Sequence, residues 1–358
     1  MSKIFCGVDF HKNESVLCVK TEKGEQVEPI TTIKTKLLRQ YLSNKKDWVI
    51  GIEASGGTNE IATRLKADGH EVVIFNPNQI RGITQSMKKT DRNDCQVLAD
   101  ALRLNFIPSV HLKSRTSREL KSLLTNREIL VRSRVNFTNH IRGTLREYGI
   151  TMPVGAEAFM KHVGASIKLL TCPIIAGILE KILEQAKELQ VMEKQIEQSL
   201  QVLLKEDHRF TLLQTMPGIG IMTAAAMLSV VDDISRFPDA SRFSAYLGLV
   251  PKVRSSADTC MMGSITRSGP EILRRYLIHG ARAWMMYEAT PQDRDRLWAE
   301  GVKKRHGMNK ATVALAHRMA RIAFAMLRDN RPYQGRQKKK QAGTAKPENC
   351  ELNQTQAA

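Results

Sequence analysis

Short apolar runs alternate with helical segments along the first 110 residues. Five segments predict β-strands, at 4–10, 15–20, 27–33, 48–53 and 71–75. The second alternates between apolar and polar residues, whereas the first is a short apolar run and the fourth has the pattern of a buried strand. Pro29 favours an edge position for the third run, because proline cannot donate to a strand ladder. Helical spacing follows over 36–43, in a segment ending at Leu65, and over 91–104. Residues 1–110 therefore predict an α/β domain.

Residues 111–205 carry almost no strand pattern and predict long helices. Apolar residues recur there every seven positions, at Ile175, Ile182, Leu189, Ile196 and Leu203. A companion set three residues later is partly polar, with Ile178, Gln185, Met192 and Ser199. Two interpretations stay open: an antiparallel or intermolecular coiled coil, and an ordinary long helix of a bundle.

The remaining chain divides into a folded part and a tail. Residues 206–330 predict a mostly helical domain with a loop-rich middle at 251–269. Residues 331–358 are polar, include three consecutive lysines and lack apolar periodicity, which predicts a disordered tail. The sequence thus predicts four segments: 1–110, 111–205, 206–330 and 331–358.

The charge of the chain points to a polyanionic partner. Its 358 residues include 55 basic and 36 acidic side chains, a formal net charge of +19. Such an excess favours nucleic acid over a generic basic surface. Six scattered cysteines without a C-x-x-C pair argue against a disulfide scaffold or a zinc ribbon. With no apolar run of membrane-spanning length and no cleavable signal, we expect a cytoplasmic protein and no membrane partner.

Four carboxylates occupy positions that predict a metal site. Asp9 ends the first strand, Glu53 ends the fourth, and Asp91 and Asp94 share one face of a helix start. Taken singly, Asp91 is explained by the helix dipole and Asp94 by solvation. Asp9 is harder to explain in this way, because an acid after a buried strand costs desolvation. If the strands are neighbours the four acids converge, and Mg²⁺ or Mn²⁺ would neutralise them.

Several motifs then carry a family resemblance, in family order over about residues 1–328. The N-terminal ones are Gly7-Val8-Asp9, Glu53-Ala54-Ser55-Gly56 and Lys89-Thr90-Asp91-Arg92-Asn93-Asp94. The C-terminal ones are Met216-Pro217-Gly218-Ile219-Gly220, the stretch 243–251, Ser255-Ser256 with 263–269, and Leu273-Arg274-Arg275. The chain resembles the insertion-sequence "one-ten" transposases, the Piv/MooV-like DEDD recombinases.

The resemblance implies a RuvC-like (RNase H-fold) N-terminal domain, a helical coiled-coil middle and a helical C-terminal transposase domain with a helix-hairpin-helix-like segment. It implies an RNA-guided recombinase that binds a structured bridge RNA and donor and target double-stranded DNA, as a tetramer built from two dimers. Asp9, Glu53, Asp91 and Asp94 would be the metal acids. Ser256 would form a 5′-phosphoserine intermediate. Ala257 stands where the family usually has glycine, which keeps Ser255 as the alternative register.

A set of basic residues and glycines is expected to contact nucleic acid. Most lie on the predicted helix after residue 111, and the others flank the acids, the Pro-Gly turn or the serines. The set is Lys88, Lys89, Arg92, Arg115, Arg118, Lys121, Arg132, Arg134, Gly218, Gly220, Arg254 and Arg267. For the two glycines, a plain helix-start turn explains the sequence equally well.

Two rival functions remain open at this point. The first is a metal-dependent nuclease or junction resolvase of the same fold with water as nucleophile, for which both serines would be dispensable. The second is a non-catalytic, nucleic-acid-binding scaffold whose acids are structural. His11, near Asp9, is a candidate base, although the sequence favours an exposed histidine without a role.

Overall fold

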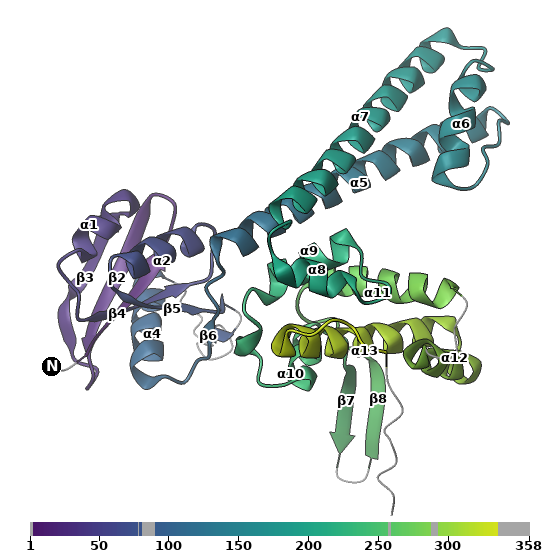
Figure 1. The fold of residues 1–358 in the computed structure, drawn as a ribbon. Helices are drawn as coiled ribbons and strands as arrows, with labels where there is room; N and C mark the ends of the chain where they lie inside the picture. Colours follow the sequence, from purple (N-terminus) through teal and green to yellow (C-terminus); the bar gives the residue numbers. More distant parts are fainter. Residues whose placement is uncertain (1–2, 78, 81–89, 257–258, 288–292, 336–358) are drawn as a thin grey trace, which may run out of the picture. The chain divides into compact units, whose positions relative to one another are not determined.

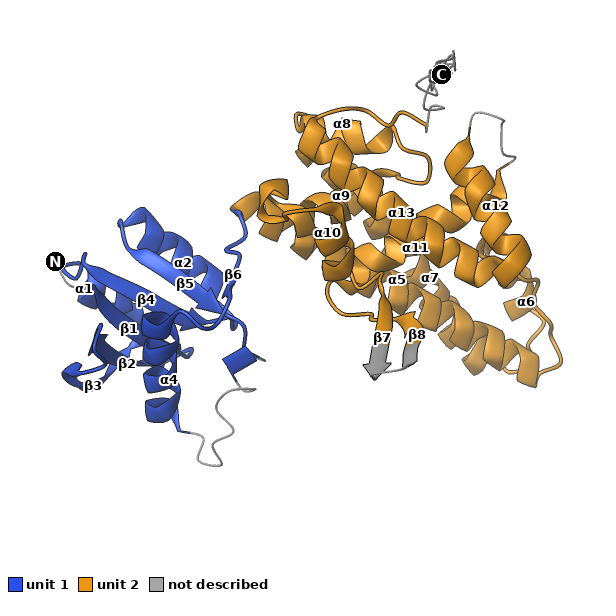
Figure 2. Cartoon of the chain, turned by 90° about the horizontal axis from the view of Figure 1, so that it is seen from below, with its two compact units in different colours: residues 1–114 blue, residues 115–358 orange. Residues whose placement is uncertain are grey.

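The computed structural model describes residues 3–335 except 78, 81–89, 257–258 and 288–292, with the side chains of 254–260 also outside the description. It divides into two compact units, Met1–Ser114 and Arg115–Ala358 (Figure 2). Each unit is described by itself. Within the described residues, no helix is both long enough and apolar enough to cross a membrane.

Unit 1 is built on a six-stranded sheet in the order β3-β2-β1-β4-β5-β6 (Figure 1). The strands are β1 Ile4–Phe10, β2 Glu14–Thr21, β3 Gln26–Lys34, β4 Trp48–Glu53, β5 Glu71–Phe75 and β6 Ser109–Val110. β1 pairs in parallel with β4 and antiparallel with β2, while β4 and β5 are parallel. β3 lies at the sheet edge, where Pro29 placed it in the prediction. This order is compatible with an RNase H-like fold.

Helices cover both faces of that sheet. They are α1 Leu38–Leu42, which follows the 3-10 turn Thr35–Leu37, α2 Thr58–Ala67 and α4 Asp91–Leu104. Apolar side chains of α1 and α2 join Cys6, Val8 and Ile50 in one buried cluster. On the other face, Leu98 and Leu102 of α4 are buried with Val49 and Phe75. The predicted α/β character of residues 1–110 is confirmed.

Unit 2 begins with a long helical hairpin. Its helices are α5 Arg115–Glu147, α6 Ala156–Ile167 and α7 Pro173–Leu203, and α5 and α7 lie side by side in Figure 1. Arg127 bonds to Glu197 and Arg134 to Glu193, while Ile141 near the end of α5 is buried with Leu179 near the start of α7. Later residues of α5 thus meet earlier residues of α7, so the two helices are antiparallel.

The buried face of α7 differs from the predicted heptad face. Its buried residues are Leu179, Leu183, Ala186, Glu193 and Leu200. The predicted positions Ile178, Met192 and Leu203 are 54%, 48% and 43% exposed. The buried set is displaced by one residue from the predicted one and includes Glu193, which is paired with Arg134 of α5, a partner that an apolar pattern alone does not reveal. The coiled coil itself stays a prediction.

The rest of unit 2 is a helical domain with one two-stranded ribbon. Its elements are α8 His208–Gln214, α9 Ile221–Val231, the 3-10 turn Ile234–Arg236, α10 Ala240–Tyr246, β7 Pro251–Ser256, β8 Thr259–Ile265, α11 Glu271–Met286, α12 Arg294–His306 and α13 Met308–Asp329. One large buried cluster combines these helices with Leu120 and Leu124 of α5 and Leu200 of α7. The core is therefore continuous across residue 205, and a separate domain border there stays a prediction.

Candidate functional site

Two of the predicted acids lie side by side at one edge of the sheet. β1 and β4 are parallel and in register, with Val8 opposite Ile52. Asp9 and Glu53 are the next residue of each strand, so both stand at the carboxyl ends of adjacent strands. Asp9 is buried and Glu53 half-buried. This edge is where parallel strands commonly present functional groups.

Glycines in both strands let α4 approach the backbone of the sheet. A β-carbon at Gly7 would lie 2.2 Å from the carbonyl oxygen of Cys95 and 2.4 Å from the amide nitrogen of Ala99. One at Gly51 would lie 2.6 Å from a methyl carbon of Leu102. Since side chains alternate along a strand, Asp9 is on the same face as Gly7, and therefore on the face that α4 covers. The glycines thus bring the start of α4 to the acid of β1.

Local sequence fixes where α4 begins. Thr90 is its N-cap, with extended backbone and a hydroxyl that accepts a hydrogen bond from the amide of Asn93 at 3.3 Å. Asp91 and Asp94 occupy the first turn, where the helix dipole favours negative charge. Capping and dipole therefore explain both why the helix starts here and why acids are tolerated at its start.

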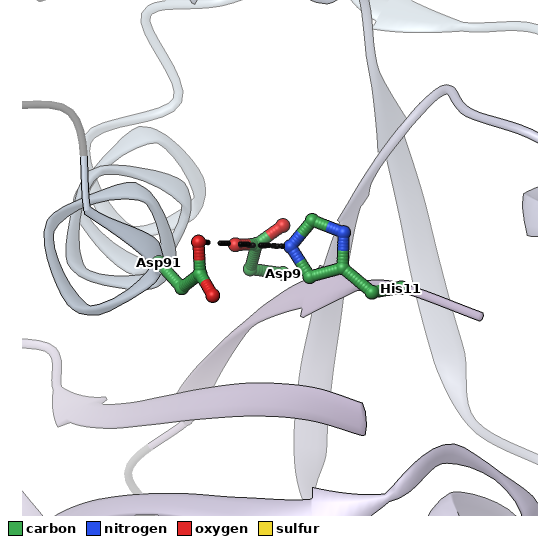
Figure 3. A group of neighbouring side chains, drawn as sticks. All are labelled: Asp9, His11 and Asp91. Atoms are coloured by element: carbon green, nitrogen blue, oxygen red, sulfur yellow. Dashed lines mark hydrogen bonds and ion pairs between the residues drawn. The ribbon is translucent and has the colours of Figure 1, made fainter. Parts of the chain in front are cut away.

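Asp9, His11 and Asp91 form a compact group of potential metal ligands (Figure 3). His11 Nε2 lies 3.1 Å from Asp9 Oδ2 and 3.8 Å from Asp91 Oδ1. One ligand atom from each of the three lies within 4.8 Å of the others. Figure 3 shows the imidazole and the Asp91 carboxylate pointing toward Asp9 from two elements. The side chains of His11 and Asp91 are 54% and 64% exposed, so the group opens to solvent.

Electrostatics make Asp9 the residue that most needs a cation. Burial raises the pKa of the Asp9 carboxyl, and the charges of Asp91 and Asp94 raise it further. The charge of His11 and its hydrogen bond lower this pKa but do not cancel the rise. A divalent cation bound to the carboxylate would favour the ionised form. The carboxylate oxygens of the buried Asp9 and the exposed Asp91 are ligands that Mg²⁺ and Mn²⁺ prefer.

The structure gathers only part of the predicted acid set within ligand distance. Asp9 and Asp91 are brought together, while Glu53 and Asp94 fall outside the compact group. Asp94 is close enough for its charge to act on Asp9, and Glu53 shares the strand edge. His11 is a member that the acid pattern missed as a ligand. Its place two residues after Asp9, where alternation returns to the same face, was the available signal.

The predicted serines lie on the β7–β8 ribbon. Ser255 pairs in register with Cys260 and Ser256 with Thr259, but the side chains of these residues and of Arg254 are outside the described part. Lys88 and Lys89 are outside it altogether. For these five residues the predicted roles stay predictions.

The base of that ribbon is held by close backbone contacts. A β-carbon at Gly248 would lie 2.1 Å from the carbonyl oxygen of Ser268, and one at Gly269 would lie 2.0 Å from that of Tyr246. The guanidinium of Arg274, which is 9% exposed, donates to the carbonyls of Leu247 and Ser268 at 3.3 and 3.2 Å. The motifs around 246–249 and 267–269 are therefore joined to each other, and together they fix where the ribbon starts.

Arg267, at the foot of the ribbon, has an exposed side chain on unusual backbone. Its φ of 58° is in the left-handed region, which costs a non-glycine residue energy unless its surroundings impose it. The amide of Arg267 donates to the carbonyl of Gly248 at 3.2 Å, which helps to hold that conformation. The predicted phosphate contact at Arg267 is thus sterically open.

The basic residues of α5 fall into two groups. Lys121 and Arg132 are exposed, and Arg115 is exposed although it bonds to Glu119 at 2.9 Å. Arg134 instead makes two hydrogen bonds to Glu193, at 2.7 and 3.1 Å, with a side chain that is 22% exposed. The charge of Arg134 is thus engaged by α7, while the first three side chains face solvent.

The remaining predicted contacts are also placed by the structure. Arg92 is exposed and Arg118 half-buried. Gly220 is exposed with open space where a β-carbon would be, whereas Gly218 packs against the backbone of α11: a β-carbon there would lie 2.5 Å from the carbonyl oxygen of Gly280. Packing therefore accounts for Gly218 without a phosphate.

Comparisons with known proteins agree over most of the chain. Residues 210–297 match the family model described as Transposase IS116/IS110/IS902 family, and residues 6–150 match a second transposase model of the DEDD, IS110 type. The transposase for insertion sequence element IS1111A of Coxiella burnetii is 31% identical over 330 residues, covering 91% of this chain and 90% of the relative. The probable family 20 transposase of Pseudomonas aeruginosa is 30% identical, over 90% and 92%. The pilin gene-inverting protein of Moraxella lacunata is 26% identical, over 94% and 99%.

Proposed function

Since the chain belongs to the IS116/IS110/IS902 family of transposases and is a DNA recombinase, we propose that it cuts and rejoins DNA strands with a divalent metal held at Asp9 and Asp91. The observation that carries the proposal is the Asp9–His11–Asp91 group, which lies within the matched residues 6–150. Glu53 and Asp94, at the same edge, complete the predicted ligand set.

The metal's contribution would be electrostatic. When bound, Mg²⁺ or Mn²⁺ neutralises charge on the phosphodiester and makes a coordinated oxygen a better nucleophile or leaving group. The raised pKa of Asp9 supports this role, because the carboxylate lacks full compensation from His11 alone. Asp91 contributes its charge from an exposed side chain at the helix start.

Ser256 is the proposed nucleophile. Its hydroxyl oxygen attacks the phosphorus as the bond to the 3′ oxygen breaks, and the proton that the serine gives up is balanced by the one that the departing 3′ oxygen takes up. A free 3′-hydroxyl and a 5′-phosphoserine result. The 3′-hydroxyl of the exchanged strand then attacks the phosphoserine, which releases Ser256 and forms the new phosphodiester. Each step makes one phosphorus–oxygen bond for the one it breaks. The close contacts of Gly248 and Gly269 and the hydrogen bonds of Arg274 support this role, because they fix the base of the β7–β8 ribbon.

The proposed RNA, DNA and protein partners follow from the family resemblance. A structured bridge RNA would pair with donor and target DNA, and the protein would assemble as a tetramer of two dimers. The exposed cations Lys121 and Arg132 and the low aromatic content of 5% support backbone contacts with sequence reading left to base pairing. The exposed Arg267 would hold a phosphate beside the serines.

Covalent trapping tests the chemistry. The full chain is incubated with RNA from its element, end-labelled donor and target DNA and Mg²⁺, and then quenched in SDS. We expect a protein–DNA adduct in wild type that is lost in Ser256→Ala and in Asp9→Asn and retained in Ser255→Ala. Omitting the RNA should abolish the adduct, and chelation of the metal should do the same.

Other outcomes would redirect the proposal. Strand cleavage without an adduct, unaffected by either serine substitution, would establish the water-using nuclease instead. Loss of the adduct in Ser255→Ala alone would move the nucleophile by one residue. An adduct that forms equally well without RNA would refute guidance while leaving the serine chemistry intact.

A further inference from the structure

Unit 2 contains a pocket of about 500 Å³, and none of the predicted site residues lines it. It lies between α12, α13 and the segment that follows α13. Its volume is in the range of small-molecule sites, roughly 300–1,000 Å³. The side chains that matter for its chemistry are Trp298 of α12, His317, Arg318 and Arg321 of α13, and Arg331 and Tyr333 beyond it.

A buried ion pair builds the frame of this pocket. Asp295 is 1% exposed. It forms an ion pair with Arg318, whose Nε lies 2.6 Å from Oδ1, and it accepts a hydrogen bond from the hydroxyl of Tyr333 at 3.0 Å. Burial and the charge of Asp295 raise the pKa of Tyr333, so the phenol stays a donor. Tyr333 also packs edge-on against Trp284. The segment after α13 is thereby pinned against α11 and α12, and the pocket is a built feature of the fold.

Trp298 gives the pocket an aromatic wall. The guanidinium carbon of Arg318 lies 4.5 Å from the centre of the Trp298 ring, which holds the indole in place. Even so, Trp298 remains 39% exposed, whereas the other tryptophans, Trp48 and Trp284, are 5% and 3% exposed. A rigid, accessible aromatic ring is the usual platform on which an unstacked base is bound.

Two further arginines, Arg321 and Arg331, line the pocket, and the charge of Arg331 acts on the nearby carboxylate of Asp329. Asp295 is engaged by Arg318, and Asp329 by Arg328 at 2.7 and 3.0 Å. Arg321 and Arg331 are exposed and form no ion pair with any residue that the structure describes. Burial and the charge of Arg321 lower the pKa of His317, which leaves a neutral imidazole as a hydrogen-bonding group. The pocket thus offers stacking, positive charge and one neutral polar group.

We propose that this pocket binds one unstacked nucleotide of a single-stranded nucleic acid, with the base on Trp298 and the phosphate at Arg321 and Arg331. A duplex keeps its bases in the stack, so its bases do not reach the ring. Neither the predicted carboxylates nor the predicted serines line the site, and its occupation requires no strand chemistry. RNA and DNA share the base and the phosphate, and the 2′-hydroxyl distinguishes them.

Fluorescence and anisotropy with the full chain test the proposal. Fluorescein-labelled 12-mers of deoxythymidine and of uridine are titrated against protein, and tryptophan emission is followed with unlabelled 12-mers. We expect binding to quench emission, because the accessible tryptophan is the one in contact. Trp298→Phe should remove the quench and keep the affinity within about 3-fold, since phenylalanine also stacks. Trp298→Leu should weaken binding by about 5- to 100-fold.

Matched charge variants test the phosphate contact. Arg321→Gln should weaken binding and reduce the salt dependence by about one counterion. Arg146→Gln removes the same charge from an exposed residue in the last turn of α5, and it should change affinity by less than about 2-fold. Tighter binding of the uridine 12-mer would identify RNA as the source, and equal binding would identify a contact that ignores the 2′-hydroxyl.

Two results would overturn the proposal. One is an unchanged affinity in Trp298→Leu, because the base would then not stack there. The other is an equal loss in Arg321→Gln and Arg146→Gln, which would reduce the effect to general charge. Thermal melting of each variant shows that it is folded, and Trp298→Phe keeps the test decisive even if Trp298→Leu unfolds.

Discussion

The contact of α4 with its sheet and the contact between α5 and α7 solve the same problem in opposite ways. In unit 1, Gly7 and Gly51 remove side chains so that α4 touches the backbone of β1 and β4. In unit 2, long side chains span the space between the helices, and Arg134 reaches Glu193 across it. A helix in contact with the sheet backbone has little room to shift, whereas helices joined by long, ion-paired side chains can shift further because those side chains can change conformation. The chain uses the stiffer solution where Asp9 and Asp91 must meet.

The most disruptive change should be Gly7→Ala. The added β-carbon would lie 2.2 Å from the carbonyl oxygen of Cys95 and 2.4 Å from a second backbone atom, so neither obstacle can rotate away. We expect a loss of about 3 kcal/mol in the free energy of unfolding. Denaturant titration measures that loss, and Mn²⁺ binding should weaken because Asp91 moves with α4.

Gly56→Ala is the matched control, since Gly56 has open space around its Cα and is exposed. It should change the free energy of unfolding by less than about 0.5 kcal/mol. Equal losses in the two variants would show that α4 is not seated by the glycines.

A smaller effect is expected from Glu193→Gln in the hairpin. Glu193 is 6% exposed, and its loss leaves Arg134 without its charged partner in a mostly buried position. Because the Arg134 side chain is still 22% exposed, we expect about 2 kcal/mol, below the loss for a fully buried pair.

An exposed pair within α5, Arg115 and Glu119, provides the comparison. Glu119→Gln breaks the contact of Glu119 with Arg115, whose side chain is 86% exposed, and should cost about 0.3 kcal/mol. Urea unfolding of both variants measures the difference. If Glu193→Gln costs no more than Glu119→Gln, burial of the hairpin pair contributes nothing.

The smallest effect is a pH-dependent one at Asp9. Burial raises its pKa in the folded protein, so the folded state binds the proton more tightly than the unfolded chain does. Stability therefore falls as pH rises from the ordinary aspartate pKa through the raised one. In metal-free protein, Asp9→Asn should stabilise the fold at pH 7 and have no such effect below the ordinary pKa.

Thermal melting of wild type and Asp9→Asn at pH 7 and below the ordinary aspartate pKa, with and without Mn²⁺, measures the difference in stability. With Mn²⁺ bound, wild type should be more stable than Asp9→Asn at pH 7, because cation binding stabilises the wild-type fold and the asparagine variant lacks that contribution. A metal-free Asp9→Asn protein that is less stable than wild type at pH 7 would contradict the assigned pKa direction.

Local patterns were sufficient to predict much of unit 1. The apolar runs of β1, β2, β4 and β5 reflect burial of the sheet by helices on both faces, and the acids at the ends of β1 and β4 mark the edge where these strands end. The start of α4 was readable too, because Thr90 caps it and acids follow. These features depend on residues close together in the sequence, where periodicity and capping act.

Features that depend on distant partners could not be predicted. Arg134 has the sequence of a phosphate contact, yet α7 supplies Glu193 to it from 59 residues away. Gly218 has the sequence of a phosphate-binding turn, yet it faces Gly280. The pocket beside Trp298 depends on a segment beyond α13 that the sequence analysis assigned to a disordered tail. In each case the deciding group comes from an element that no local pattern identifies.

The contact between Gly218 and Gly280 also joins the turn before α9 to α11 through backbone atoms. Each residue's missing β-carbon would strike the other's carbonyl oxygen, at 2.5 and 2.0 Å, so the turn before α9 rides directly on α11. α11 starts two residues after Gly269, at the foot of the serine ribbon. A displacement of the ribbon base along α11 would therefore also displace the turn at 215–220, because the two are in direct backbone contact.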